Sequence, residues 1–223
     1  MKRARMIIIA LMLAVSTAGW AQKYYDHEVS AETVAWDLRD MMERFTRYIE
    51  IVGTTQTLSN GVYTPNRKVN AIIKDSVPSL FYDYKNVKMI TTQGVGGKVM
   101  KQQPMNDYFR RLEIQSRSEF YKVEYSLEFD LLASGTELKW KEEKDPAKIN
   151  RYGNGAKLSY AEVTIYQEYR RYKRIRGRGN ETKLDKVEED RKTMKVYKIE
   201  IYNQTIISLG DVTKAERYHT EQY

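Results

Sequence analysis

Few side chains in this sequence are of the types that usually carry acid–base or metal chemistry. The chain has two histidines, His27 and His219, and no cysteine. His27 precedes the first predicted helix and His219 lies in the last residues, so neither is expected in a pocket. No histidine pair has metal-ligand spacing and no Asp-x-Asp loop occurs. We therefore predict no metal site and no cofactor.

The other familiar catalytic patterns are incomplete. Gly94, Gly96 and Gly97 stand before Lys98, but neither G-x-x-x-x-G-K-[ST] nor G-x-G-x-x-G is completed. No G-x-S-x-G occurs either. An enzyme would have to use a buried carboxylate as base and a tyrosine hydroxyl to polarise a carbonyl. Asp83 and Asp107 are the candidate acids.

Tyrosine is unusually abundant, at 18 residues. Its ring and hydroxyl recur where glycans, peptides or proteins are bound, although tyrosine is also a good strand former. Within a predicted cavity, the candidate ligand-binding residues are Tyr108, Tyr121 and Tyr125. The candidate partner-binding residues are three tyrosines on the outer face of the sheet, Tyr160, Tyr166 and Tyr172, and four arginines of a basic hairpin, Arg170, Arg171, Arg174 and Arg176.

The arginines of that set belong to a basic run around Tyr172. Such runs can bind single-stranded nucleic acid, but the export signal described next favours phosphate-bearing lipid or an acidic protein instead. The alternative is a solvated, mobile hairpin tip over residues 173–192, neutralised by its own acids.

The first 21 residues have the pattern of a signal peptide. Lys2, Arg3 and Arg5 precede an apolar run from Met6 to Gly19, and small residues stand before Gln22. The run is shorter than the roughly 20 residues of a spanning helix. We predict cleavage after Ala21, no remaining transmembrane anchor, and a periplasmic or secreted protein whose formal charge falls from +8 to +5.

Three helices are predicted. Ser30 can cap a helix whose apolar residues recur at three- and four-residue steps as far as Val52, with Gly53 as a left-handed cap. We expect Trp36, Met41 and Phe45 on its covered side. A second helix is expected from Thr64 with Pro65 in its first turn, and a short third helix spans residues 104–115.

Long strands follow in the second half of the chain. Residues 120–131 alternate strictly, with Val123 and Tyr125 on the apolar side and Lys122 and Glu124 on the other, which predicts a sheet with one solvated face. Further strands are expected at residues 86–92, 158–172, 193–201 and 205–212. Residues 133–157 are predicted to form a polar excursion, and the tail after Lys214 is expected to fray.

This order of elements resembles the NTF2-like superfamily, in which a curved antiparallel sheet wraps around N-terminal helices. The resemblance covers Ser30 to Val212, and the segment Pro104-Met105-Asn106-Asp107-Tyr108-Phe109-Arg110-Arg111-Leu112 is similar to a stretch of exported bacterial proteins. It implies a single α+β domain over residues 22–223, with charged insertions near 133–157 and 173–192. It does not transfer a function.

Three functional hypotheses remain open. The first is a non-enzymatic module of the bacterial envelope that contacts an envelope protein or an anionic surface, but not nucleic acid, through the aromatic sheet face and the basic hairpin. The second is a small-ligand-binding cone or a carboxylate/Tyr enzyme, which requires a cavity of a few hundred Å3 with a convergent acid. The third is a secretion-apparatus subunit. A homodimer is compatible with each.

Overall fold

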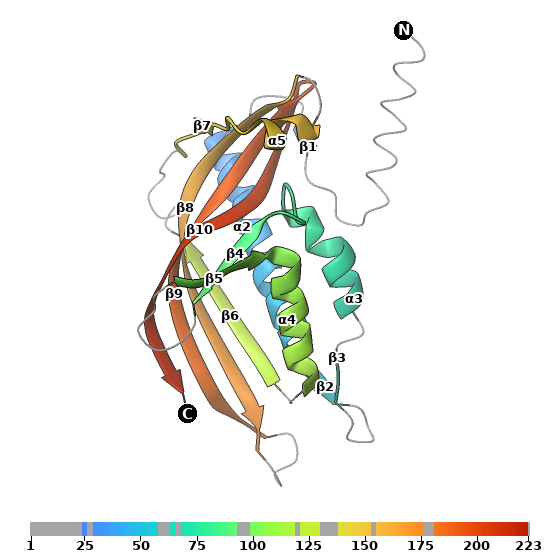
Figure 1. The fold of residues 1–223 in the computed structure, drawn as a ribbon, viewed down its shortest axis with the longest axis vertical. Coiled ribbons are helices and arrows are strands. Elements are labelled where there is room, and N and C mark those ends of the chain that lie inside the picture. The colour runs from blue at the N-terminus through green and yellow to red at the C-terminus, as the bar shows by residue number, and fades with distance from the viewer. Residues whose placement is uncertain are drawn as a thin grey trace.

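The structure is a computed structural model that describes residues 24–25, 29–57, 63–65, 68–92, 99–118, 121–129, 138–152, 155–175 and 181–222. It is an α+β fold in which a curved antiparallel sheet stands beside several helices (Figure 1). The predicted signal peptide, residues 1–21, lies outside the described residues. Among the described helices, none has the length and hydropathy needed to cross a bilayer.

Helix α2, Ala31–Gly53, is the first long element, and its prediction is confirmed. The Ser30 hydroxyl caps it by accepting the Thr33 N–H at 3.2 Å. The apolar stripe is buried, but Trp36 is 64% exposed, so that expectation was wrong. At 100° per residue, Trp36 lies about 200° around the helix from Val34, on the solvent side.

Gly53 ends α2 for a different reason from the one predicted. The left-handed cap is absent, since the chain leaves the helix through Thr54 in an extended conformation. Glycine is needed instead because a Cβ there would lie 3.0 Å from Cγ2 of Val123 on β6, Tyr121–Phe129. The end of α2 therefore packs directly against this strand.

The start of the second predicted helix was wrong. Thr64 and Pro65 belong to β3, Tyr63–Pro65, which pairs with β2, Thr55–Thr57. A residue before proline favours extended backbone, and this preference outweighs the helix-starting role of proline. Helical turns begin only at α3, Val69–Ala71, and continue as a π-turn, Ile72–Ser76, and a 3-10 turn, Pro78–Leu80.

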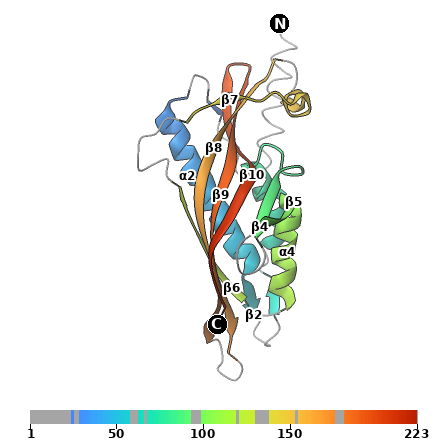
Figure 2. The same ribbon diagram turned by 60° about the vertical axis from the view of Figure 1, so that its left-hand side comes forward.

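A hairpin and a helix form the next unit. β4, Lys88–Thr92, pairs with β5, Val99–Pro104, and α4, Met105–Ser118, follows directly. The predicted strand at 86–92 and helix at 104–115 are thus confirmed, whereas β5 had not been predicted. Both views place α4 and this hairpin on the same side of the long strands (Figures 1 and 2).

The core is centred on Phe45 of α2. Its ring makes edge contacts with Phe81, Phe109 and Tyr125, at centroid distances of 5.8, 6.0 and 6.4 Å. These partners come from the turn before β4, from α4 and from β6. One aromatic side chain therefore fixes α4 and β6 relative to α2.

The main sheet has the order β1-β10-β9-β8-β6, with β7 also paired to β8, and every pairing is antiparallel. The strands other than β6 are β1, Tyr24–Tyr25; β7, Lys141–Glu142; β8, Lys157–Arg174; β9, Thr182–Ile201; and β10, Gln204–Gln222. On β6, Val123 and Tyr125 are buried while Lys122 is exposed, which confirms the predicted alternation.

Two predictions about this sheet were wrong. Residues Thr182 to Lys192 are not a solvated hairpin tip, because they are strand paired with β8 and, from Lys186 onward, also with β10. The tail does not fray after Lys214, since β10 continues to Gln222. The turn between β9 and β10 is Tyr202-Asn203, whose φ angles of 49° and 65° suit a tight hairpin loop.

The predicted polar excursion is partly structured. Its described part, residues 138–152, contains β7, the short helix α5, Pro146–Ile149, and a 3-10 turn, Asn150–Tyr152. This segment lies at the end of the sheet where β9 turns into β10 (Figure 1).

Candidate functional site

The three tyrosines predicted to bind a ligand lie in different environments. Tyr108 of α4 is 9% exposed and Tyr125 of β6 is 4% exposed. The Tyr125 hydroxyl donates to the side-chain oxygen of Gln167 on β8. The backbone of Tyr121 pairs with Lys173, but its side chain lies outside the described part of the structure. Tyr108 and Gln167 both line the cleft described next.

A cleft of about 230 Å3 separates α4 and the β4–β5 hairpin from one face of the sheet. The helix side contributes chiefly Tyr108, Arg111 and Leu112, and the hairpin contributes Thr91 and Gln103. The sheet side contributes Gln167, Tyr169, Arg171, Lys186, Glu188, Asp190, Lys192 and Arg217. The walls are therefore mostly polar and charged, with apolar surface supplied by two tyrosine rings and a leucine.

A buried ion cluster forms the sheet side of this cleft. Arg217 Nε donates to Asp190 Oδ1 at 2.7 Å, and the same guanidinium contacts Glu188. Lys192 Nζ lies 3.5 Å from Asp190 Oδ2 and donates to the Gln167 oxygen at 2.7 Å. Asp190 is the ladder partner of both Gln167 and Arg217, so the cluster follows from strand register.

Burial and charge act against each other in this cluster. Burial lowers the pKa of Lys192, although Asp190 opposes the shift. Burial also disfavours the charge on Arg217, but hydrogen bonds and charges from Asp190 and Glu188 outweigh it and raise the pKa. Burial raises the pKa of the Tyr108 and Tyr125 hydroxyls, which keeps both protonated.

Arg171, predicted as part of a basic hairpin, lines this cleft beside Tyr169 of the same strand. Its Nε donates to Asp185 Oδ2 at 2.7 Å, and Lys173 Nζ lies 3.2 Å from Asp185 Oδ1. The register slips between Arg171 and Tyr172, which leaves Asp185 as the extra residue of a bulge on β9. Burial works against the Asp185 carboxylate, but these two cations prevail and lower its pKa.

Gln103 and Arg111 are the lining residues whose polar groups are least satisfied by the described residues. Gln103 is 6% exposed, and its oxygen accepts from Arg111 Nη1 at 3.4 Å. The Gln103 nitrogen, Nε2, is buried and has no hydrogen-bond partner among the residues that the structure describes. Arg111 likewise has no described carboxylate within ion-pair distance, unlike Arg171, Lys186, Lys192 and Arg217.

The predicted aromatic stripe lies on the face of β8 opposite the cleft. Tyr160, Tyr166 and Tyr172 are all half-buried. A cation lies over each ring: Lys195 at 3.9 Å, Arg191 at 5.9 Å and Lys122 at 5.4 Å from the respective centroids. The rings are thus already partly covered by the chain's own side chains.

The arginines predicted to bind a partner are divided among three settings. Arg170 is exposed and pairs with Glu168, with Nε 2.7 Å from Oε1. Arg174 is half-buried at the end of β8. Arg176 lies outside the described residues, and Arg171 lines the cleft. Among the described members of the set, Arg170 and Arg174 therefore share the β8 face of Tyr166 and Tyr172, whereas Arg171 lies on the cleft side.

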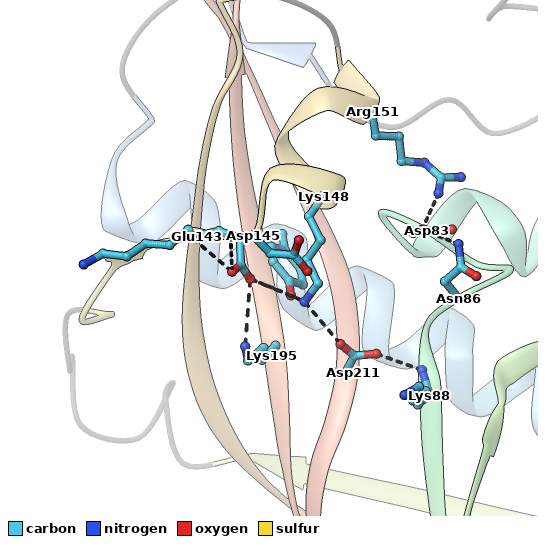
Figure 3. Close-up of polar contacts among 11 residues, drawn as sticks. Asp83, Asn86, Lys88, Glu143, Asp145, Lys148, Arg151, Lys195 and Asp211 are labelled. Atoms are coloured by element: carbon cyan, nitrogen blue, oxygen red, sulfur yellow. Dashed lines mark hydrogen bonds and ion pairs between the residues drawn. The ribbon is translucent and has the colours of Figure 1, made fainter.

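A second polar cluster lies near the β9–β10 turn, on the side covered by α5 (Figure 3). Lys148 of α5 donates to the Tyr197 hydroxyl at 3.0 Å and lies 3.4 Å from Glu143 Oε2 and 3.8 Å from Asp211 Oδ2. Asp211 Oδ1 also accepts the backbone N–H of Lys88 at 2.9 Å. These contacts join α5, β9, β10 and β4.

The candidate catalytic acids lie outside the cleft lining. Asp83 is buried, pairs with Arg151 and accepts from Asn86 Nδ2 at 2.8 Å. Asp107 is exposed on the first turn of α4. His219 is half-buried, 3.7 Å from Glu221, and His27 lies outside the described residues. Across the described residues, no three His, Asp or Glu side chains gather as a metal site.

Sequence reasoning missed most of the cleft. Glu188, Asp190, Lys192 and Arg217 lie in segments predicted to be solvated. Their two-residue spacing along β9, Glu188-x-Asp190-x-Lys192, was the available signal, because alternate residues of a strand share a face.

Comparisons with known proteins add no family: no protein-family model, no curated protein and no solved structure matches the chain. The fold and the site therefore define the class of this protein: an α+β protein with a curved antiparallel sheet and a charged cleft beside α4.

Proposed function

We propose that this protein binds a small anionic ligand in the cleft between α4, the β4–β5 hairpin and the sheet. The observation that carries the proposal is the charge of the lining. The lining has five cations, Arg111, Arg171, Lys186, Lys192 and Arg217, and two carboxylates, Glu188 and Asp190, while Asp185 beside the lining pairs with Arg171. A concave site with this excess attracts anions and repels cations.

Binding is a better account than catalysis. The carboxylate of Asp190 is already engaged by Arg217 and Lys192, and that of Glu188 is engaged by Arg217 and Lys186. The hydroxyl of Tyr125 is engaged with Gln167. Both carboxylates in the described lining of the cleft therefore already have cation partners, which does not favour a general-base role.

We also propose that the fold is an NTF2-like cone and that the protein is exported. The curved antiparallel sheet, the packing of α2 against β6 and the cleft beside the sheet support an NTF2-like cone. The basic, then apolar start of the chain supports export to the periplasm or beyond. Mass spectrometry of the mature protein tests the export proposal, because a chain that starts at Gln22 is expected.

The binding proposal can be tested by titration calorimetry with four small probes. We expect benzoate or phenyl phosphate to bind, and neutral benzamide and cationic benzylamine not to bind. Arg111→Gln should weaken anion binding about tenfold, since a charge-assisted contact is lost. Arg110→Gln is the matched control, because Arg110 is exposed on the same helix outside the lining. Equal affinity for the four probes would contradict the proposal.

A second candidate is contact with an envelope protein or an anionic membrane through the opposite sheet face. The half-exposed Tyr166, with Arg191 over its ring, favours it. Co-sedimentation with phosphatidylglycerol vesicles tests the membrane form, and Arg170→Glu with Arg174→Glu should abolish it. Arg171 must stay unchanged, because it pairs with Asp185. Vesicle binding that survives the double substitution would remove the basic strand end from this hypothesis.

A further inference from the structure

The side-chain nitrogen of Gln103, which has no partner among the described residues, indicates what the ligand must offer. Gln103 is more than nine-tenths buried and lines the cleft, yet its Nε2 has no described partner. Buried donors without partners are rare, because the group loses its hydrogen bonds to water and gains none in the protein. The accessible surface of this nitrogen is close to zero, so a ligand acceptor in the cleft would satisfy the donor only after a small shift of the side chains around it.

The orientation of this amide is fixed by its neighbour. An arginine can only donate hydrogen bonds, so the side chain of Arg111 requires the amide oxygen of Gln103 to face it. The reversed amide would place two donors together. The nitrogen is therefore the atom left for the ligand, immediately beside the guanidinium.

The charge at this position is one uncompensated cation. The other four cations of the lining contact carboxylates, whereas no described carboxylate lies within ion-pair distance of Arg111. Glu188 and Asp190 in the same cleft disfavour a second negative charge on the ligand. A carboxylate carries one charge, whereas a phosphate monoester carries about 1.5 to 2 at neutral pH.

The remaining lining indicates the body of the ligand. Tyr108, Leu112 and Tyr169 supply ring and methyl surface to the same cleft. A volume of about 230 Å3 lies just below the roughly 300–1,000 Å3 of most small-molecule sites. This room suits a single ring or a short chain.

We infer that the ligand is a small monocarboxylate with an apolar body, whose carboxylate accepts from Arg111 and from Nε2 of Gln103. Gln103 is then the residue that determines specificity for this group. The inference rests on the proposed function, since it names the class of anion that the cleft takes.

Benzoate is the probe for the experiment, with calorimetry on the wild-type protein and on Gln103→Glu. The substitution keeps the length of the side chain but replaces the donor by an anion that can pair with Arg111. We expect binding at least about tenfold weaker. Gln102→Glu is the matched control, because Gln102 is exposed on the same strand, and it should change binding less than about twofold.

A direct readout is the side-chain NH2 signal of Gln103 in a 15N-labelled sample. Benzoate should shift this signal more than it shifts the signal of Gln102. If Gln103→Glu fails to give the wild-type circular dichroism spectrum, Gln103→Met replaces it, because methionine keeps the length and removes the donor.

The outcomes separate the inference from the proposed function. Phenyl phosphate binding tighter than benzoate, with dependence on Arg111, would keep an anion cleft and overturn the monocarboxylate. Benzoate binding that is indifferent to both Gln103 variants would overturn the role of Gln103. Failure of all the anionic probes would overturn both proposals together.

Discussion

The two ends of the long sheet use the same strands in opposite ways. Toward the β9–β10 turn, the inward positions are apolar and fully buried, as with Met194, Val196 and Leu209; we call this the packed half, β9 residues 193–201 with β10 residues 204–212. Toward the chain end, β9 residues 182–192 with β10 residues 213–222 form the charged half. Its inward positions include Asp190, Lys192 and Arg217.

The difference lies in what covers each face. In the packed half, core side chains cover one face of the sheet. On the other face, the ring of Tyr82 covers Tyr197, with 4.0 Å between the two ring centroids. In the charged half, α4 stands across a cleft, so the strand faces polar space. Strand pairing alone therefore does not require an apolar interior. Charges can occupy inward positions as long as each finds a partner.

The largest expected effect tests the charged half. Asp190→Asn should destabilise the protein by about 3–5 kcal/mol, because it leaves Lys192 and Arg217 buried with less compensation. Urea denaturation measures the change. Lys192→Met in the Asp190→Asn background should recover part of the loss. A loss below about 1 kcal/mol would mean that water, rather than Asp190, compensates these cations.

The next effect tests the packed half by adding one methyl group. A Cβ at Gly210 would lie 2.3 Å from Cε2 of Tyr197, whose ring is fully buried and cannot move aside. Gly210→Ala should therefore cost about 1–3 kcal/mol through overpacking. Gly155→Ala is the contrasting control, because that site is open but has φ of +91°. Its cost, about 1–2 kcal/mol, would come from the backbone alone.

The contrast between the halves also separates what the sequence could predict from what it could not. The α2 stripe, the short helix α4 and the alternation on β6 follow local periodicity, and the structure confirms them. The charged half was assigned to solvent because composition was taken as evidence of exposure. The strand period was present in Glu188-x-Asp190-x-Lys192, but its meaning depends on Arg217, nearly thirty residues away.

The candidate site shows the same limit. Tyr108 was predicted to bind a ligand, and its side chain lines the cleft. Gln103 could not be recognised, because a lone glutamine in a polar strand carries no pattern. Its importance arises from tertiary contacts that bury the amide and turn its oxygen toward Arg111. Arg171 was predicted as part of a partner-binding basic run, although its position on β8, two and four residues after Tyr169 and Gln167, places it on the cleft side.

The smallest expected effect asks whether the packed half also depends on charge. Glu143 is buried, accepts the backbone N–H groups of Lys144 and Asp145, and contacts Lys148 and Lys195 (Figure 3). Burial raises its pKa, but the Asp145 N–H and the two lysines outweigh burial, so the folded-state pKa lies below the ordinary 4.5. The resulting stability is present above pH 4.5 and is lost as the pH falls through the folded-state value.

Glu143→Gln should therefore cost about 1 kcal/mol at neutral pH, and the difference from wild type should shrink as the pH falls below about 4.5. Urea denaturation over a series of pH values measures it, with the exposed neighbour Glu142→Gln as the matched control. A difference that does not change with pH would mean that Glu143 acts through shape and neutral hydrogen bonds. The two halves would then differ in kind. A loss as large as that of Asp190→Asn would mean that α5 is held to the packed half by charge, and that the halves differ only in where their ions lie.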